Sequence, residues 1–160
     1  MINNSILNIN KRPYAFAKIK GNSNYPNLAG IVYFYELRAG VLVLIQVNGL
    51  PSQNNICKRA IFAVHIHSGG SCTGNADDPF ADAMTHYNPD DCDHPYHAGD
   101  LPPIFSADGL GFSAFLTNRF TPKEIIGKTI IIHSSPDDFT TQPSGNSGIK
   151  IACGVITSVY

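Results

Sequence analysis

Half of the chain's histidines lie in one acidic, proline-containing stretch, THYNPDDCDHPYHAGD at residues 85–100. His86, His94 and His97 fall within it, and Asp100 follows three residues after the last of them. Imidazole and carboxylate groups together suit zinc and copper, whereas calcium and magnesium prefer oxygen ligands alone. The stretch therefore predicts a zinc or copper site.

The other three histidines lie in segments that look like strands. His65 and His67 are two residues apart in AIFAVHIH (60–67), and His133 ends KTIIIH (128–133). Because side chains alternate across a sheet, the first two rings project from the same face. The six histidines and the loop aspartate give seven candidate ligands, more than one four-coordinate ion needs, so two metal ions are expected.

Short segments rich in β-branched and aromatic residues, bounded by turn residues, predict the strands that position these side chains. They lie at 15–20, 30–37, 40–47, 60–67, 111–117, 128–133 and 149–156. No window repeats apolar residues at the helical period, so no helix is expected. Seven or eight short strands favour a sandwich or flattened barrel. Residues 68–103 and 134–148 lack strand character and predict two long loops, a length that is uncommon unless a loop is functional or disordered.

Composition narrows the class of protein. The 160 residues are expected to form a single domain over 1–160, and 14% charged residues with 14 glycines favour a β-rich fold. A net charge of −1 argues against a nucleic-acid partner, and no apolar run approaches the roughly 18–20 residues of a membrane span. The first residues, MINNSILNINKRP, do not resemble a signal peptide, so a cytoplasmic protein is expected.

Five segments, in this order and spacing, resemble the copper/zinc superoxide dismutase family. They are VHIHSGGSCTG (64–74), HYNP (86–89), HPYHAGDLPPI (94–104), IIGKTIIIHSSPDD (125–138) and GNSGIKIACGVI (145–156). The first 60 residues match only as strands that end in a GLP turn. The resemblance implies an all-β, eight-stranded Greek-key barrel or sandwich with two long functional loops.

The resemblance also implies a copper site and a zinc site that share one ligand. The residues expected to hold copper are His65, His67, His86 and His133. Those expected to hold zinc are His86, His94, His97 and Asp100. His86 takes the place of the imidazolate that bridges the two ions. Asp137 falls where the family has a carboxylate joining a copper-ligand histidine to a zinc-ligand one, although alone it could be a turn-forming residue.

The four cysteines lack the C-x-x-C spacing of a zinc knuckle or redox motif, so by themselves they read as buried or free thiols. The resemblance implies that Cys72 and Cys153 form a disulfide that ties the long loop to the barrel. Such a bond would be unusual in a cytosol. Cys57 and Cys92 match nothing functional in the family.

The activity implied by the resemblance is dismutation of superoxide. Cu(II) oxidises one superoxide to dioxygen, and Cu(I) reduces a second, with two protons, to hydrogen peroxide. His86 and Lys150 are the expected catalytic residues, because the family's bridging imidazole takes up a proton and a cation near copper attracts the substrate. A homodimer is left open, since no readable motif marks an interface.

Three departures from the family pattern keep two other functions open. Lys150 stands where the family has an arginine, and it lacks the planar fork that docks an anion through two hydrogen bonds. The loop DFTTQPSGN is short and has no Lys or Glu, and the insertion-like segment before His86 adds Asp77, Asp78 and Asp82. The alternatives are a non-enzymatic copper- and zinc-binding protein and a structural protein that binds zinc only.

Overall fold

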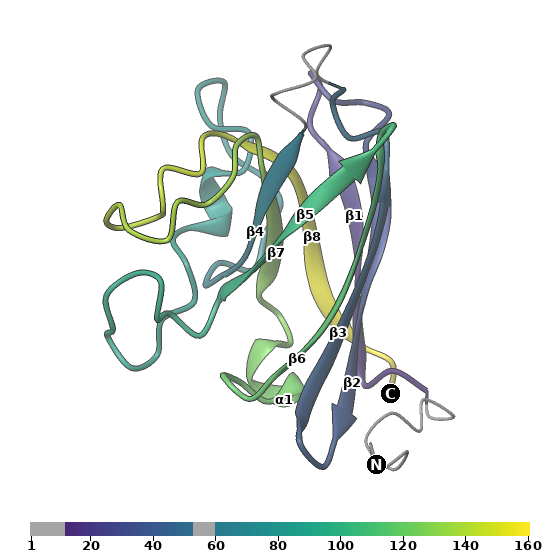
Figure 1. The fold of residues 1–160 in the computed structure, drawn as a ribbon, viewed down its shortest axis with the longest axis vertical. Helices are drawn as coiled ribbons and strands as arrows, with labels where there is room; N and C mark the ends of the chain where they lie inside the picture. The colour runs from purple at the N-terminus through teal and green to yellow at the C-terminus, as the bar shows by residue number, and fades with distance from the viewer. Residues whose placement is uncertain (1–11, 53–59) are drawn as a thin grey trace.

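The computed structural model describes residues 12–52 and 60–160, and its strands close into one antiparallel barrel (Figure 1). The order around the barrel is β1-β2-β3-β6-β5-β4-β7-β8, so β3 lies beside β6 and β4 beside β7, as a Greek key requires. The bounds are β1 Ala15–Gly21, β2 Ala29–Leu37, β3 Gly40–Asn48, β4 Ile61–His67, β5 Asp100–Ala107, β6 Leu110–Thr117, β7 Thr129–His133 and β8 Lys150–Ser158. The expected all-β, eight-stranded fold is confirmed.

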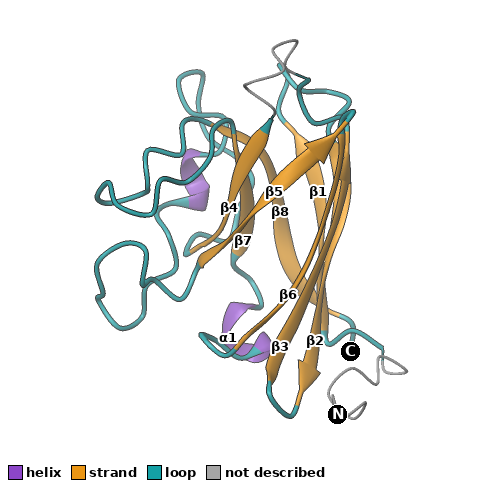
Figure 2. Ribbon diagram, in the orientation of Figure 1, coloured by secondary structure: helices purple, strands orange, loops and turns teal. Residues whose placement is uncertain are grey.

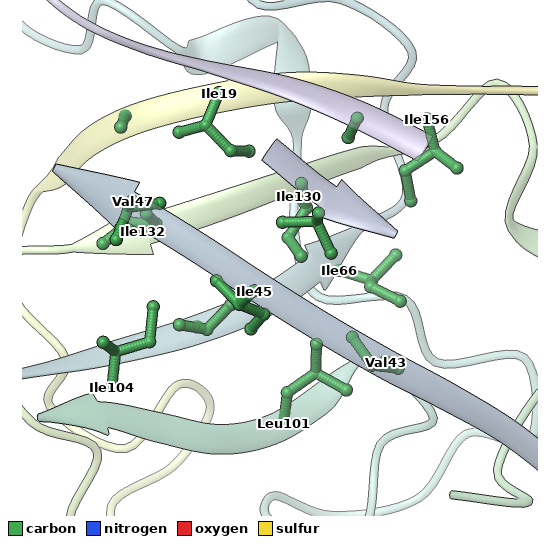
Figure 3. Packing of buried hydrophobic residues seen from close by; sticks show 14 of the residues in the cluster. Ile19, Val43, Ile45, Val47, Ile66, Leu101, Ile104, Ile130, Ile132 and Ile156 are labelled. Atoms are coloured by element: carbon green, nitrogen blue, oxygen red, sulfur yellow. The ribbon is translucent and has the colours of Figure 1, made fainter. Parts of the chain in front are cut away.

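Alternation of side chains along the strands builds the barrel interior. In β1, Ala15, Ala17 and Ile19 are buried while Lys18 and Lys20 are exposed, which is the period of two expected for a sheet with one solvated face. Aliphatic side chains from β3, β4, β5, β7 and β8 meet inside the barrel, among them Val43, Ile66 and Ile156, as Figure 3 shows. This packing is the dominant favourable contribution to folding and holds the strands in register.

Strands β4 and β7 are buried on both faces, unlike β1. Val64 and Ile66 of β4 face the interior with Ile130 and Ile132 of β7. Their outward faces carry the strand histidines instead of solvent-exposed polar residues. The two long loops, β4 to β5 and β7 to β8, gather beside these strands and cover them (Figure 2).

The fold corrects the prediction that residues 68–103 contain no strand, since β5 starts at Asp100. The Pro-Pro pair in DLPPIF obscured it, because proline cannot donate to a ladder and weakens a strand pattern. The register between β4 and β5 shifts around Ala63, so neither Pro102 nor Pro103 has to donate. The Ala63 amide donates to the Ser135 carbonyl oxygen at 2.9 Å instead.

Two short helical segments also correct the expectation of no helix. They are a 3₁₀ turn, Ala81–Ala83, and α1, Pro122–Ile125. Helix α1 begins with a capping box between Thr121 and Glu124 and a proline in its first turn, which are local signals that a search for apolar periodicity over a long window does not detect.

Within the described ranges, no helix has the length and apolar character needed to cross a membrane. The cytoplasmic location and the single domain over 1–160 stay predictions. Cys57 lies outside the described residues.

Candidate metal centre

Three histidines reach the centre from the barrel wall. His65 and His67 lie on the outward face of β4. His133 is the last residue of β7, which pairs with β4. All three side chains are buried beneath the loops. Their Cα positions are set by the antiparallel ladder, which the interior packing holds in place.

The other three histidines come from the loop between β4 and β5, which is hydrogen-bonded to the barrel. The Tyr87 amide donates to the Ile66 carbonyl oxygen at 2.8 Å, and the Ile66 amide donates to the Gly99 carbonyl oxygen at 2.9 Å. These bonds place His86 opposite His67 in an isolated antiparallel bridge. The loop therefore presents its histidines directly over the outward face of β4.

The rings and one carboxylate form two clusters that share His86. Within each cluster, the candidate ligand atoms all lie within 4.8 Å of one another, and every member is buried. One cluster contains His65, His67, His86 and His133. The other contains His86, His94, His97 and Asp100. The structure thus brings together both sets of residues expected from the sequence, while their assignment to copper and zinc stays a prediction.

Hydrogen bonds on the outer side of the first cluster fix which ring nitrogen faces inward. His65 Nε2 bonds Asp137 at 2.8 Å, and His67 Nδ1 bonds the Met84 carbonyl oxygen at 2.8 Å. His133 Nδ1 bonds the Gly148 carbonyl oxygen at 3.3 Å. Each ring therefore donates outward and keeps its other nitrogen free as an acceptor for a metal ion.

The inward nitrogens have the character of metal ligands. Among the described residues, the Nδ1 of His65 and the Nε2 of His86 are buried with no hydrogen-bond partner. The Nε2 atoms of His67 and His133 face each other at 3.3 Å. Buried polar atoms without partners are costly, and one cation among these four nitrogens would satisfy them all.

The second cluster gathers around the carboxylate of Asp100. The Nδ1 atoms of His86, His94 and His97 lie 2.8, 3.1 and 3.3 Å from its oxygens. Three imidazole nitrogens and one carboxylate oxygen are a donor set that suits tetrahedral zinc. His86 contributes Nδ1 to this cluster and directs Nε2 to the other, so one ring can contact two ions.

Asp137 connects the two clusters from the side facing away from the ligand atoms. Its carboxylate oxygens accept hydrogen bonds from His65 Nε2 at 2.8 Å and His94 Nε2 at 2.9 Å. A side chain at Gly145, where φ is 66°, would collide with this carboxylate. Burial opposes ionisation of Asp137, but the hydrogen bonds from His65, the Phe139 amide and His94 outweigh it and lower its pKa to about 2.

The strand histidines are held in the neutral form. Burial, followed by the neighbouring His133, lowers the pKa of His67 well below its usual value. Burial, followed by His65, lowers the pKa of His133 to about 3. Neutral imidazole is the form that binds metal ions, so this environment prepares both rings as ligands near pH 7.

A cleft of about 640 Å³ opens onto the centre. Its wall includes His67, His86 and His133 of the first cluster, together with Lys150, and His97 of the second. His94 and Asp100 are not among its lining residues. The first cluster is therefore the one that offers more of its ligands to a small molecule.

Covalent and polar links anchor the loop. The expected disulfide between Cys72 and Cys153 is confirmed, and it ties the loop to β8. Cys92 is exposed and free, and it belongs to neither candidate metal cluster. The loop anchors therefore include one covalent link, and Cys92 contributes no candidate ligand.

Two residues that the sequence did not single out also hold this loop. Arg119 Nη1 donates to the carbonyl oxygens of Pro95, His97 and Asp100 at 3.1 to 3.2 Å. The Gln142 side chain pairs with the backbone of His94, accepting at 3.0 Å and donating at 2.7 Å. Neither contact has a local sequence signal, because the partners are at least 19 residues apart.

Comparison with known proteins agrees with the fold and the centre. The family model described as copper/zinc superoxide dismutase matches residues 28–156. Superoxide dismutase [Cu-Zn] 2 of Aquifex aeolicus is 35% identical over 76% of this chain and 74% of its own length. Superoxide dismutase [Cu-Zn] of Deinococcus radiodurans is 33% identical over 82% of this chain and 79% of its own. The chain belongs to the copper/zinc superoxide dismutase family.

An extracellular relative is also similar. The extracellular superoxide dismutase [Cu-Zn] of Oryctolagus cuniculus is 30% identical over 82% of this chain and 55% of its own length.

Proposed function

We propose that the protein converts superoxide to dioxygen and hydrogen peroxide, and that its two clusters hold copper and zinc. The observation that carries the proposal is the shared ring of His86, whose Nε2 belongs to a four-imidazole cluster and whose Nδ1 belongs to a cluster with a carboxylate. Four imidazoles suit copper, and three imidazoles with one carboxylate suit zinc. His65, His67, His86 and His133 would hold copper, and His86, His94, His97 and Asp100 would hold zinc.

Bound copper would supply the one-electron steps that oxidise one superoxide and reduce the next, and zinc would hold the loop. The chain's own residues position the substrate and move protons. Lys150 Nζ lies at the cleft wall and provides a cation for a small anion. His86 lines the same cleft, and its Nε2 is buried without a hydrogen-bond partner among the described residues. This nitrogen can therefore hold a proton.

The test is inhibition of superoxide-driven dye reduction by protein loaded with both metals, together with elemental analysis of the natively purified protein. We expect dismutase activity and one copper and one zinc per chain. Zinc without copper would favour the structural alternative, and both metals without activity would favour the non-enzymatic one. Lys150→Arg should be faster than wild type, because a guanidinium can dock an anion through two hydrogen bonds.

We also propose that the protein forms a homodimer through the outer face of β3, β5 and β6. The side chains of Phe105, Leu110, Phe112 and Leu116 are 67, 62, 63 and 43% exposed there. A solvated sheet face normally carries polar residues, so this apolar face indicates an interface. Together the four side chains offer roughly half of the ~800 Å² that each partner contributes to a standard interface.

The charge pattern favours a second copy of the chain as the partner. Strands β3 and β6 contain no charged residue, and the one in β5, Asp100, is buried in the metal centre. An uncharged face can therefore meet its own copy across a two-fold axis without like-charge repulsion.

Sedimentation of wild type at about 50 μM should give a dimer, above a Kd of order micromolar. Phe112→Glu should give a monomer, while Tyr160→Glu, a control at an exposed site two residues after β8, should stay dimeric. A wild-type monomer, or a dimer that survives Phe112→Glu, would contradict this interface.

A further inference from the structure

Among the described residues that line the cleft, Lys150 is the only Lys or Arg, and it is already paired with a carboxylate. Lys150 Nζ donates to Asp78 Oδ2 at 2.7 Å and to the Phe80 carbonyl oxygen at 3.0 Å. The Lys150 side chain is 15% exposed and the Asp78 side chain 40%, and both residues line the cleft. The cation expected to attract an anion is therefore already paired at the wall of the cleft.

Asp78 is held in this position by its own loop. Its other oxygen accepts a hydrogen bond from the Phe80 amide at 3.0 Å, and its backbone amide donates to the Asn75 side chain at 2.9 Å. Phe80 is buried against Cys153 and Cys72, which are joined by the disulfide. The pair therefore joins a loop and a strand, β8, that are already fixed relative to each other.

The charges around the cleft also disfavour anions. Asp77 lines the wall beside Asp78, so two carboxylates accompany one ammonium group. An anion that approaches Lys150 has to compete with a carboxylate that is built into the loop. Local competition of this kind is stronger than the effect of a distant surface charge, which salt screens.

We propose that Asp78 determines the affinity of the centre for small anions by competing with them for Lys150. The proposal rests on the proposed function, since it concerns the anion that enters this cleft. Asp78 acts through Lys150 and touches neither cluster of candidate ligands, so it is a specificity-determining residue and not a catalytic one.

Azide binding to the copper- and zinc-loaded protein, followed by its charge-transfer absorption, tests the proposal. Asp78→Asn is nearly isosteric and keeps an oxygen for the Phe80 amide. It should tighten azide binding by about three- to tenfold, the order expected for release of one partly exposed ion pair. Asp77→Asn, which removes the same charge from the same wall without a contact to Lys150, should change the affinity by less than about twofold.

A second substitution shows whether the effect passes through Lys150. In a Lys150→Gln background, Asp78→Asn should no longer tighten azide binding. An unchanged or weaker azide affinity in Asp78→Asn alone would overturn the proposal, and a weaker one would mean that Asp78 positions Lys150 for the anion. Equal gains from Asp77→Asn and Asp78→Asn would also overturn it, since they would indicate net charge alone.

A readout on the metal-free protein separates this proposal from the proposed function. The rate of Lys150 acetylation, measured by mass spectrometry of peptides, should rise about threefold in Asp78→Asn, because the ammonium group is then no longer paired with a carboxylate. An unchanged rate would contradict the competition. Tighter azide binding without dismutase activity would leave the role of Asp78 in place while the proposed activity fails.

Discussion

His65, His67 and His133 are fixed by the ladder of a closed barrel, whereas the loop-borne histidines depend on contacts that one loop makes with its surroundings. The strand residues need only the pairing of β4 with β7 and the packing beneath it. The loop needs a disulfide, an arginine that caps three carbonyl oxygens, and the carboxylate of Asp137. We call His65, His67 and His133 the strand half of the centre, and His86, His94 and His97 the loop half. The two halves therefore differ in how strongly their geometry depends on a bound metal ion.

This difference predicts which half is organised before any ion binds. The strand half keeps its geometry because local opening of a central ladder costs nearly the whole free energy of unfolding. The loop half has few ladder hydrogen bonds and opens at lower cost, so zinc would contribute directly to its order.

The largest expected effect separates the two halves by removing one ligand from each. His133→Asn should weaken copper binding by more than about 100-fold while zinc stays bound. This exceeds the loss of metal affinity that usually follows removal of a residue that only hydrogen-bonds to a ligand. His94→Asn should weaken zinc binding by a similar factor and raise hydrogen exchange across residues 85–99. Chelator competition and exchange mass spectrometry give both quantities. Equal loosening of the loop by the two substitutions would remove the distinction.

Loss of the disulfide tests the covalent part of the loop's anchorage. Replacing Cys72 and Cys153 by serine should lower the free energy of unfolding of the metal-free protein by about 2–5 kcal/mol, measured with denaturant. Exchange should rise in the loop more than in β4 and β7. Cys92→Ser is the control and should change stability by less than about 0.5 kcal/mol, because that thiol is exposed and free.

Acid should weaken the strand half through His133. Burial and then His65 lower its pKa to about 3 in the fold, against about 6.5 in the unfolded chain. Between these two pKa values the unfolded chain binds more protons than the folded chain. The contribution of His133 to the free energy of unfolding is therefore fully present above pH 6.5 and declines as the pH falls toward 3. For the metal-free protein we expect a loss of about 2 kcal/mol between pH 7 and pH 5 from this group.

The measurement is denaturant unfolding of the metal-free protein at several pH values. His133→Gln should show a shallower dependence on pH than wild type, since it lacks the titrating ring. Identical slopes for the two proteins would show that His133 is not the source.

The smallest expected effect comes from Arg119, which holds the loop without touching a candidate ligand atom. Arg119→Gln should weaken zinc binding by about tenfold and leave copper binding within about twofold, because its hydrogen bonds go to the backbone of the loop half. Chelator competition measures both affinities. Arg38→Gln, at an exposed turn between β2 and β3, should change neither, and a matching loss of copper affinity in Arg119→Gln would contradict the separation of the halves.

The strand half of the centre was predictable from local sequence. A spacing of two between His65 and His67 fixes a shared face wherever the segment is a strand, and β-branched neighbours make it one. The segments around His86, Asp137 and Cys153 carried the family resemblance, so both ligand sets and the disulfide could be stated before the fold was known. The start of β5 was missed because its prolines weaken a strand pattern, and a bulge accommodates them. Helix α1 was missed because its signal is a capping box, which apolar periodicity does not detect.

The contacts that adjust the centre were decided only by the tertiary structure. The sequence names Asp77, Asp78 and Asp82 as extra acids, but only the fold shows that Asp78 meets Lys150, 72 residues later. It likewise brings Arg119 to the carbonyl oxygens of the loop. Local propensities depend on neighbours a few residues away, whereas these contacts form only after the barrel closes and fixes where distant segments meet.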